Sequence, residues 1–72
     1  MLVKVEVYQD GDMWCARGIG HDIFTQGQTA DELFDNIREA VALHFENGST
    51  PPDIDILVVS ELKLPHAPAA TS

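Results

Sequence analysis

The sequence predicts one small α+β domain of element order β-β-β-α-β, with an antiparallel-rich sheet and a single helix packed on one face. Apolar and polar residues alternate over 2–8, which is typical of a half-buried strand. Thr29-Ala30-Asp31-Glu32 is a capping box that opens one amphipathic segment. A largely apolar run over 54–62 follows Pro51-Pro52 and predicts the last strand.

The first three strands are expected to be short and joined by turns. The strand over 2–8 places Val3, Val5 and Val7 on one face. Asp10-Gly11 then predicts a hairpin turn. The second strand, 13–17, puts Trp14 and Ala16 on one face and Met13, Cys15 and Arg17 on the other. A third strand is predicted over 23–26, closed by Gly27.

The helix is predicted over about 29–46. The Thr29 hydroxyl can accept a hydrogen bond from the Glu32 amide, and the Glu32 side chain can reach back to Thr29. Asn47-Gly48 provides a left-handed stop, and the proline pair prevents resumption. Residues spaced at 3.6 per turn form the expected apolar stripe: Ala30, Leu33, Phe34, Ile37, Ala40, Val41 and His44. For His44 we expect packing against the sheet edge with a solvated tip, the alternative being a pH-sensitive contact in an oligomer interface.

The last strand has apolar residues on both faces, which is typical of a strand covered on two sides. One helix can cover only one face of a four-stranded sheet, so Leu57 and Val59 are left over on the other face. Such a patch favours an interaction surface. We therefore expect homo-oligomerisation, with Leu57 and Val59 at the interface. The domain is expected to span 1–62, and the proline-containing segment 63–72 has the composition of a flexible tail.

The net charge of −8, from twelve acids and four bases, predicts a basic protein partner. Direct nucleic-acid binding is not expected, because Lys4, Arg17, Arg38 and Lys63 are scattered along the chain. The single cysteine cannot form an intrachain disulfide, and no segment has the pattern of a signal peptide or membrane span. These features predict a cytoplasmic protein that does not associate with membranes.

The motifs of common catalytic and metal sites are missing from the sequence. The three histidines lie far apart, and neither HxxxH nor CxxC spacing occurs. Cys15 falls on a predicted strand and is interpreted as a small structural residue rather than a nucleophile. We expect a non-catalytic protein with no metal and no cofactor.

Three segments carry a family resemblance. Residues 10–16, Asp-Gly-Asp-Met-Trp-Cys-Ala, are similar to a D-G-x-x-W-x-A pattern. Residues 24–29, Phe-Thr-Gln-Gly-Gln-Thr, are similar to F/C-x-T-x-G-x-T. Residues 31–33 and 36–41 match an E-E-A/L and N-I-R-E-A-I helix. In this order they make residues 3–46 resemble the HicB family of antitoxins, including its small stand-alone HicB-like members.

The resemblance implies a partial RNase H-like fold without a working nuclease site, as in the N-terminal domain of HicB. It also implies oligomerisation and the binding of HicA, a small basic toxin that cleaves mRNA. The loop over 18–23 departs from the family's Pro-x-Leu-Pro-Gly-Cys run, so if that loop contacts the toxin, the family's partner specificity does not carry over to this chain. No DNA-binding module is expected after Leu62, so autoregulation by this chain alone is not expected.

The sequence and the resemblance leave three functional hypotheses. The leading hypothesis is an antitoxin-like inhibitor of a HicA-type mRNA interferase. The second is a stand-alone HicB-like scaffold or small-ligand binder without a toxin. The third is a residual nuclease, for which Glu6, Asp55 and Glu61 would have to hold Mg²⁺. If a toxin binds, the expected contacts are exposed acids in the hairpin turn and on the helix: Asp10, Asp12, Asp31, Asp35 and Glu39.

Overall fold

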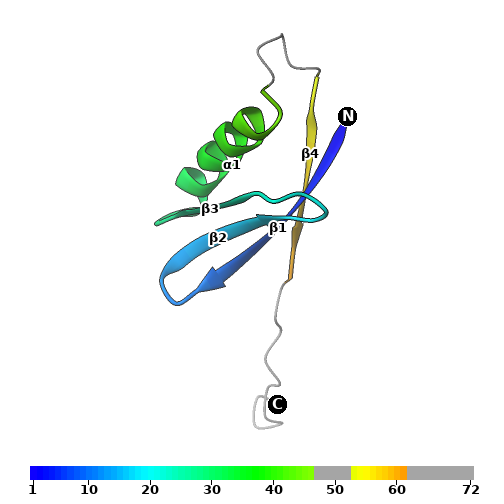
Figure 1. Ribbon diagram of the computed structural model, residues 1–72. Coiled ribbons are helices and arrows are strands. Elements are labelled where there is room, and N and C mark those ends of the chain that lie inside the picture. Colours follow the sequence, from blue (N-terminus) through cyan, green and yellow to red (C-terminus); the bar gives the residue numbers. More distant parts are fainter. Residues whose placement is uncertain (47–52, 62–72) are drawn as a thin grey trace, which may run out of the picture.

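The computed structural model describes residues 1–46 and 53–61, and it has the predicted element order. The elements are β1 (Leu2–Asp10), β2 (Met13–Gly18), β3 (Phe24–Gly27), α1 (Ala30–His44) and β4 (Asp55–Ser60). The predicted α+β class is confirmed, with one helix packed on a four-stranded mixed sheet (Figure 1). The predicted stop at Asn47-Gly48, the proline pair and the predicted tail lie outside the described residues.

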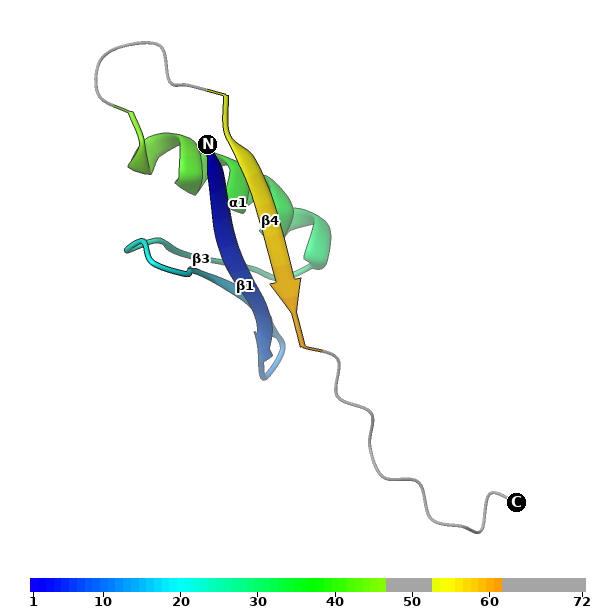
Figure 2. The same cartoon turned by 90° about the vertical axis from the view of Figure 1, so that its right-hand side faces the viewer.

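The strand order in the sheet is β3-β2-β1-β4. β1 pairs antiparallel with β2, and β2 pairs antiparallel with β3. β4 pairs with β1 in parallel, because the chain crosses over through α1 before it returns. β4 therefore lies at one edge of the sheet, beside β1 (Figure 2).

The core lies between α1 and one face of the sheet. Val3, Val5 and Val7 point toward the helix and are at most 3% exposed. Their register opposite Ala16 and Ile56 brings three strands into one apolar layer. From the helix, Leu33, Ile37 and Val41 close this layer and are at most 2% exposed. The predicted alternation in the first two strands is thus confirmed.

The helix starts where the capping box predicts. Thr29 is the N-cap, and its hydroxyl oxygen accepts a hydrogen bond from the Glu32 amide at 3.1 Å. The Glu32 carboxylate accepts from the amide of Gln28 at 3.2 Å, not from that of Thr29 as expected. The carboxylate still satisfies a free amide at the start of the helix, one residue earlier in the chain.

Two details of the predicted packing are wrong. β4 is not covered on two sides: among the described residues it has one neighbouring strand, and Leu57, Val58 and Val59 are 46%, 37% and 43% exposed. In the helix, Phe34 is 38% exposed and His44 is also exposed. Phe34 is exposed because α1 lies closest to β3 and β2, so the side of the helix nearest β4 is only partly covered. His44 lies near the end of the helix, beside the rings of His21 and Phe45.

No helix in the described ranges is long and apolar enough to cross a membrane.

Candidate partner-binding surfaces

The hairpin turn places two of the predicted contact residues at one end of the sheet. Asp10 ends β1 opposite Met13, and Gly11 and Asp12 form the turn between them. Gly11 has φ of +62°, a left-handed conformation that glycine adopts without strain. Asp10 and Asp12 are both exposed, so their carboxylates are available to a partner.

The first turn of α1 lies at the same end of the sheet. Gly27 ends β3 opposite Trp14, one residue after the start of β2, and α1 begins three residues later. Asp31 and Glu32 lie in this first turn and are exposed. Negative charge is favourable there because the helix dipole leaves its N-terminus partly positive. The fold thus brings Asp31 to the hairpin end, a placement that sequence spacing alone does not reveal.

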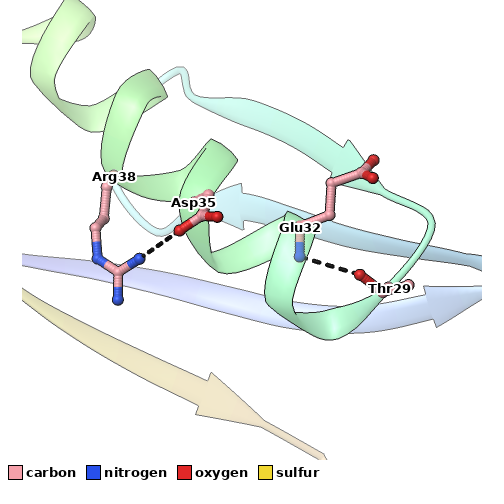
Figure 3. A network of polar contacts seen from close by, with 4 residues as sticks. All are labelled: Thr29, Glu32, Asp35 and Arg38. Atoms are coloured by element: carbon pink, nitrogen blue, oxygen red, sulfur yellow. Dashed lines mark hydrogen bonds and ion pairs between the residues drawn. The ribbon is translucent and has the colours of Figure 1, made fainter.

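Asp35 and Glu39 extend the negative charge along the outer side of α1. Both are exposed, and they follow Asp31 at helical spacing of four. Arg38 donates to the Asp35 carboxylate at 2.9 Å, while the Glu32 amide donates to Thr29 one turn earlier (Figure 3). We call Asp10, Asp12, Asp31, Asp35 and Glu39 together the acidic surface.

The opposite end of the molecule is also acidic, but it includes the N-terminal ammonium. Its acidic residues are Asp22, Glu46, Asp53 and Asp55. The N-terminal ammonium donates to the Asp53 carbonyl oxygen at 3.2 Å, and the Lys4 carbonyl accepts from Ile19 in the neighbouring loop. His21 and His44 also meet there, with ring centroids 5.7 Å apart, and both rings stack edge-on against Phe45. The acidic surface at the hairpin end has Arg38 as its nearby cation, and Asp35 already pairs with it.

An open groove of about 610 Å³ lies where β1 and β4 end. Its wall includes the aromatic rings of Tyr8 and Trp14, with Glu61 at the rim. Arg17 also lines the groove. Its Nε lies 2.6 Å from the Glu6 carboxylate, and its Cζ lies 5.6 Å from the centre of the Tyr8 ring. Sequence reasoning missed this groove, because Tyr8 and Trp14 lie on opposite faces of neighbouring strands and the sequence does not show that both line one groove where the strands end.

The two predicted interface residues lie together on the face of the sheet that α1 does not cover. Leu57 pairs with Lys4 and Val59 with Glu6, so both belong to β4 beside the polar residues of β1. They are 46% and 43% exposed. Cys15, on the same face of β2, is 4% exposed and sheltered within the sheet.

The carboxylates of the nuclease hypothesis do not come together. Asp55 begins β4, whereas Glu61 follows its last residue, so about 20 Å of extended strand separates them. Glu6 pairs instead with Arg17. Within residues 1–46 and 53–61, no group of three or more His, Cys, Asp or Glu side chains is placed to hold a metal ion.

Comparison with known proteins gives one informative relative. The chain is 42% identical over 51 residues to a UPF0150 protein of Archaeoglobus fulgidus, a match that covers 71% of this chain and 74% of the relative. The chain belongs to the UPF0150 family. UPF0150 is a family of HicB-like proteins, so the predicted resemblance is confirmed at the level of the family. No family model matches the chain, and no solved structure matches it.

Proposed function

We propose that this UPF0150 chain is an antitoxin-like protein that binds a small basic HicA-type mRNA interferase and blocks it by occlusion. The observation that carries the proposal is the acidic surface, whose exposed carboxylates lie at the hairpin end and along the outer side of α1 in a domain with net charge −8. Membership of a HicB-like family supports it. In this proposal the chain acts by binding and performs no catalysis.

The charge distribution suggests how binding would begin. Complementary potentials speed the encounter of two proteins and orient them before contact. A basic surface that binds RNA would meet the hairpin turn and the outer side of α1. The bound domain would cover the surface of the toxin that binds RNA phosphates, so inhibition needs no chemical step.

A second function, small-ligand binding by a stand-alone HicB-like domain, is favoured by a different observation. The groove beside Tyr8 and Trp14 offers aromatic surface together with the polar groups of Arg17, Glu6 and Glu61. This combination suits a small amphipathic ligand. The two functions use different residues, so substitutions can separate them.

The test searches the neighbouring genes for one that encodes a small basic protein and mixes that protein with the purified chain in calorimetry and in an RNA-cleavage assay. We expect binding that weakens as salt is raised, and loss of cleavage when the chain is added in excess. The triple variant Asp10→Asn, Asp12→Asn, Asp31→Asn should bind at least tenfold more weakly. The matched control is Asp22→Asn, Glu46→Gln, Asp53→Asn, which removes the same charge from the opposite end and should bind nearly as the wild type does.

Equal weakening in both triple variants would show that only net charge matters and would overturn the assignment to the acidic surface. Absence of binding and of inhibition would refute the antitoxin proposal. The small-ligand function would instead be supported if the purified chain binds a metabolite and Trp14→Ala abolishes that binding while leaving toxin binding unchanged.

A further inference from the structure

The two edge strands of the sheet are protected to very different degrees. β3, at one edge, has only four residues, and α1 packs over it. The side-chain amide of Asn36 also donates to the Gln26 carbonyl at 2.8 Å, which occupies an outward-facing backbone group of β3. β4, at the other edge, has six residues, and no described segment pairs with its outer side.

The backbone geometry shows which groups β4 presents outward. The Asp55 amide donates to the Met1 carbonyl at 2.8 Å, so Asp55 directs its N–H and C=O toward β1. Alternate residues of a strand face opposite edges, so Leu57 and Val59 also bond to β1. Ile56 and Val58 therefore direct their N–H and C=O groups away from the sheet.

The sequence of β4 lacks the usual devices that protect an edge. Natural edge strands carry lysine, proline, bulges or inward-pointing charges that prevent pairing with another chain. From Ile56 to Ser60 there is no charged residue, no proline and no glycine. Leu57, Val58 and Val59 are each more than a third exposed, so the strand presents apolar side chains on both faces beside its free edge.

A second uncovered feature adjoins this edge on the helix side. A small groove of about 150 Å³ runs between α1 and β4 and is lined by Phe34, Ile37, Arg38, Ile56 and Val58. Phe34 is 38% exposed although it points toward the sheet side of the helix. One further strand beside β4, with apolar residues on the same face, would cover both the groove and the edge.

We propose that β4 pairs antiparallel with β4 of a second copy of this chain, about a two-fold axis perpendicular to the sheet near Val58. The two four-stranded sheets then form one continuous sheet, with both α1 helices on the same side. The charge distribution favours a second copy as the occupant. A basic partner would be drawn to the acidic surface, whereas the strand from Ile56 to Ser60 is uncharged and matches itself.

The register follows from the two-fold axis. Val58 lies opposite Val58 of the second copy, and Leu57 lies opposite Val59 of the second copy, which joins the exposed apolar residues on the uncovered face. Asp55 lies opposite Glu61 of the second copy at each end of the paired strands. These like charges, together with the net charge of −8 on each copy, oppose association and are screened by salt.

The experiment measures molar mass by light scattering across a dilution series of the full chain, at low and high salt. We expect twice the single-chain mass at high concentration and tighter association at high salt. Val58→Lys should give the single-chain mass, because lysine at an edge strand opposes pairing. Phe24→Lys makes the same change on β3, where the side chain is 60% exposed, and should leave the dimer intact.

Cross-linking provides a second readout that does not depend on the lysine variant folding. Across the axis the two Val58 Cα atoms would be about 5.5 Å apart, within the range of a disulfide. Val58→Cys should therefore form a disulfide-linked dimer on mild oxidation, and Phe24→Cys should not, while native Cys15 stays buried. The proposal would be overturned if the wild type were a monomer at every concentration. It would also be overturned if Phe24→Lys dissociated the dimer as fully as Val58→Lys does, or if Phe24→Cys cross-linked and Val58→Cys did not.

Discussion

Replacing Gly27 with alanine tests how closely α1 approaches the sheet. A Cβ atom at Gly27 would lie 2.8 Å from the Leu33 amide nitrogen, 3.1 Å from the Leu33 Cα and 3.2 Å from the Glu32 carbonyl carbon. All three atoms belong to the helix backbone, so no side chain can rotate away. Ordinary contact begins at 3.4 Å, so the first turn of α1 would have to move by about 0.6 Å.

Such overpacking costs about 1–3 kcal/mol of unfolding free energy. The whole domain is expected to have about 4–11 kcal/mol, so the loss is a large part of its stability. Each kcal/mol lowers the melting temperature of a domain of this size by about 4–8 °C. The measurement is urea and thermal unfolding followed by far-ultraviolet circular dichroism, at one protein concentration because any self-association adds to stability.

The control for this change is Gly11→Asn in the hairpin turn. A Cβ atom there meets nothing within 4 Å, and asparagine tolerates the φ of +62° better than other residues. We expect the unfolding free energy of Gly11→Asn to lie within about 1 kcal/mol of the wild-type value. If Gly27→Ala were as stable as the wild type, the inferred close approach of β3 to the start of α1 would be refuted.

Three further changes probe the core, the helix cap and the cysteine. Leu33→Ala removes a side chain that is fully buried and should lower the unfolding free energy by about 2–5 kcal/mol in the same urea experiment. Thr29→Ala should cost about 1 kcal/mol by removing the hydrogen bond to the Glu32 amide, whereas Thr29→Ser should retain most of it. Cys15 is 4% exposed, so its thiol should react with a water-soluble disulfide reagent only at the rate of unfolding; rapid reaction in the native state would contradict its burial.

The local elements were predictable because their signals are local. The alternation of Val3, Val5 and Val7 identifies both the strand and its buried face, since side chains alternate strictly along a strand. Thr29 and Glu32 identify the start of the helix because an N-cap satisfies amides only three residues away. For the same reason Gly11 indicates the hairpin without any knowledge of the rest of the chain.

The candidate surfaces were predictable only in part. The acids of the acidic surface could be named from the sequence, because charged side chains on a short domain are usually exposed. The placement of Asp31 beside Asp10 and Asp12 at the hairpin end depends on the pairing of β3 with β2, which places Gly27 beside Trp14. Gly27 itself looks like a strand terminator in the sequence, yet its contact with the backbone of Leu33 exists only in the folded chain.

The sequence by itself determined the element order and the buried face of the first strands, because these depend on residues close together in the chain. It also determined the excess of negative charge, which is a sum over all residues. Only the tertiary structure decided that α1 packs toward β3 and leaves β4 exposed as an edge. The apolar residues on both faces of β4 are compatible with a covered central strand as well as with an exposed edge. Strand order chooses between them, and it is set by contacts between residues that are 50 or more positions apart, such as Val3 with Ile56.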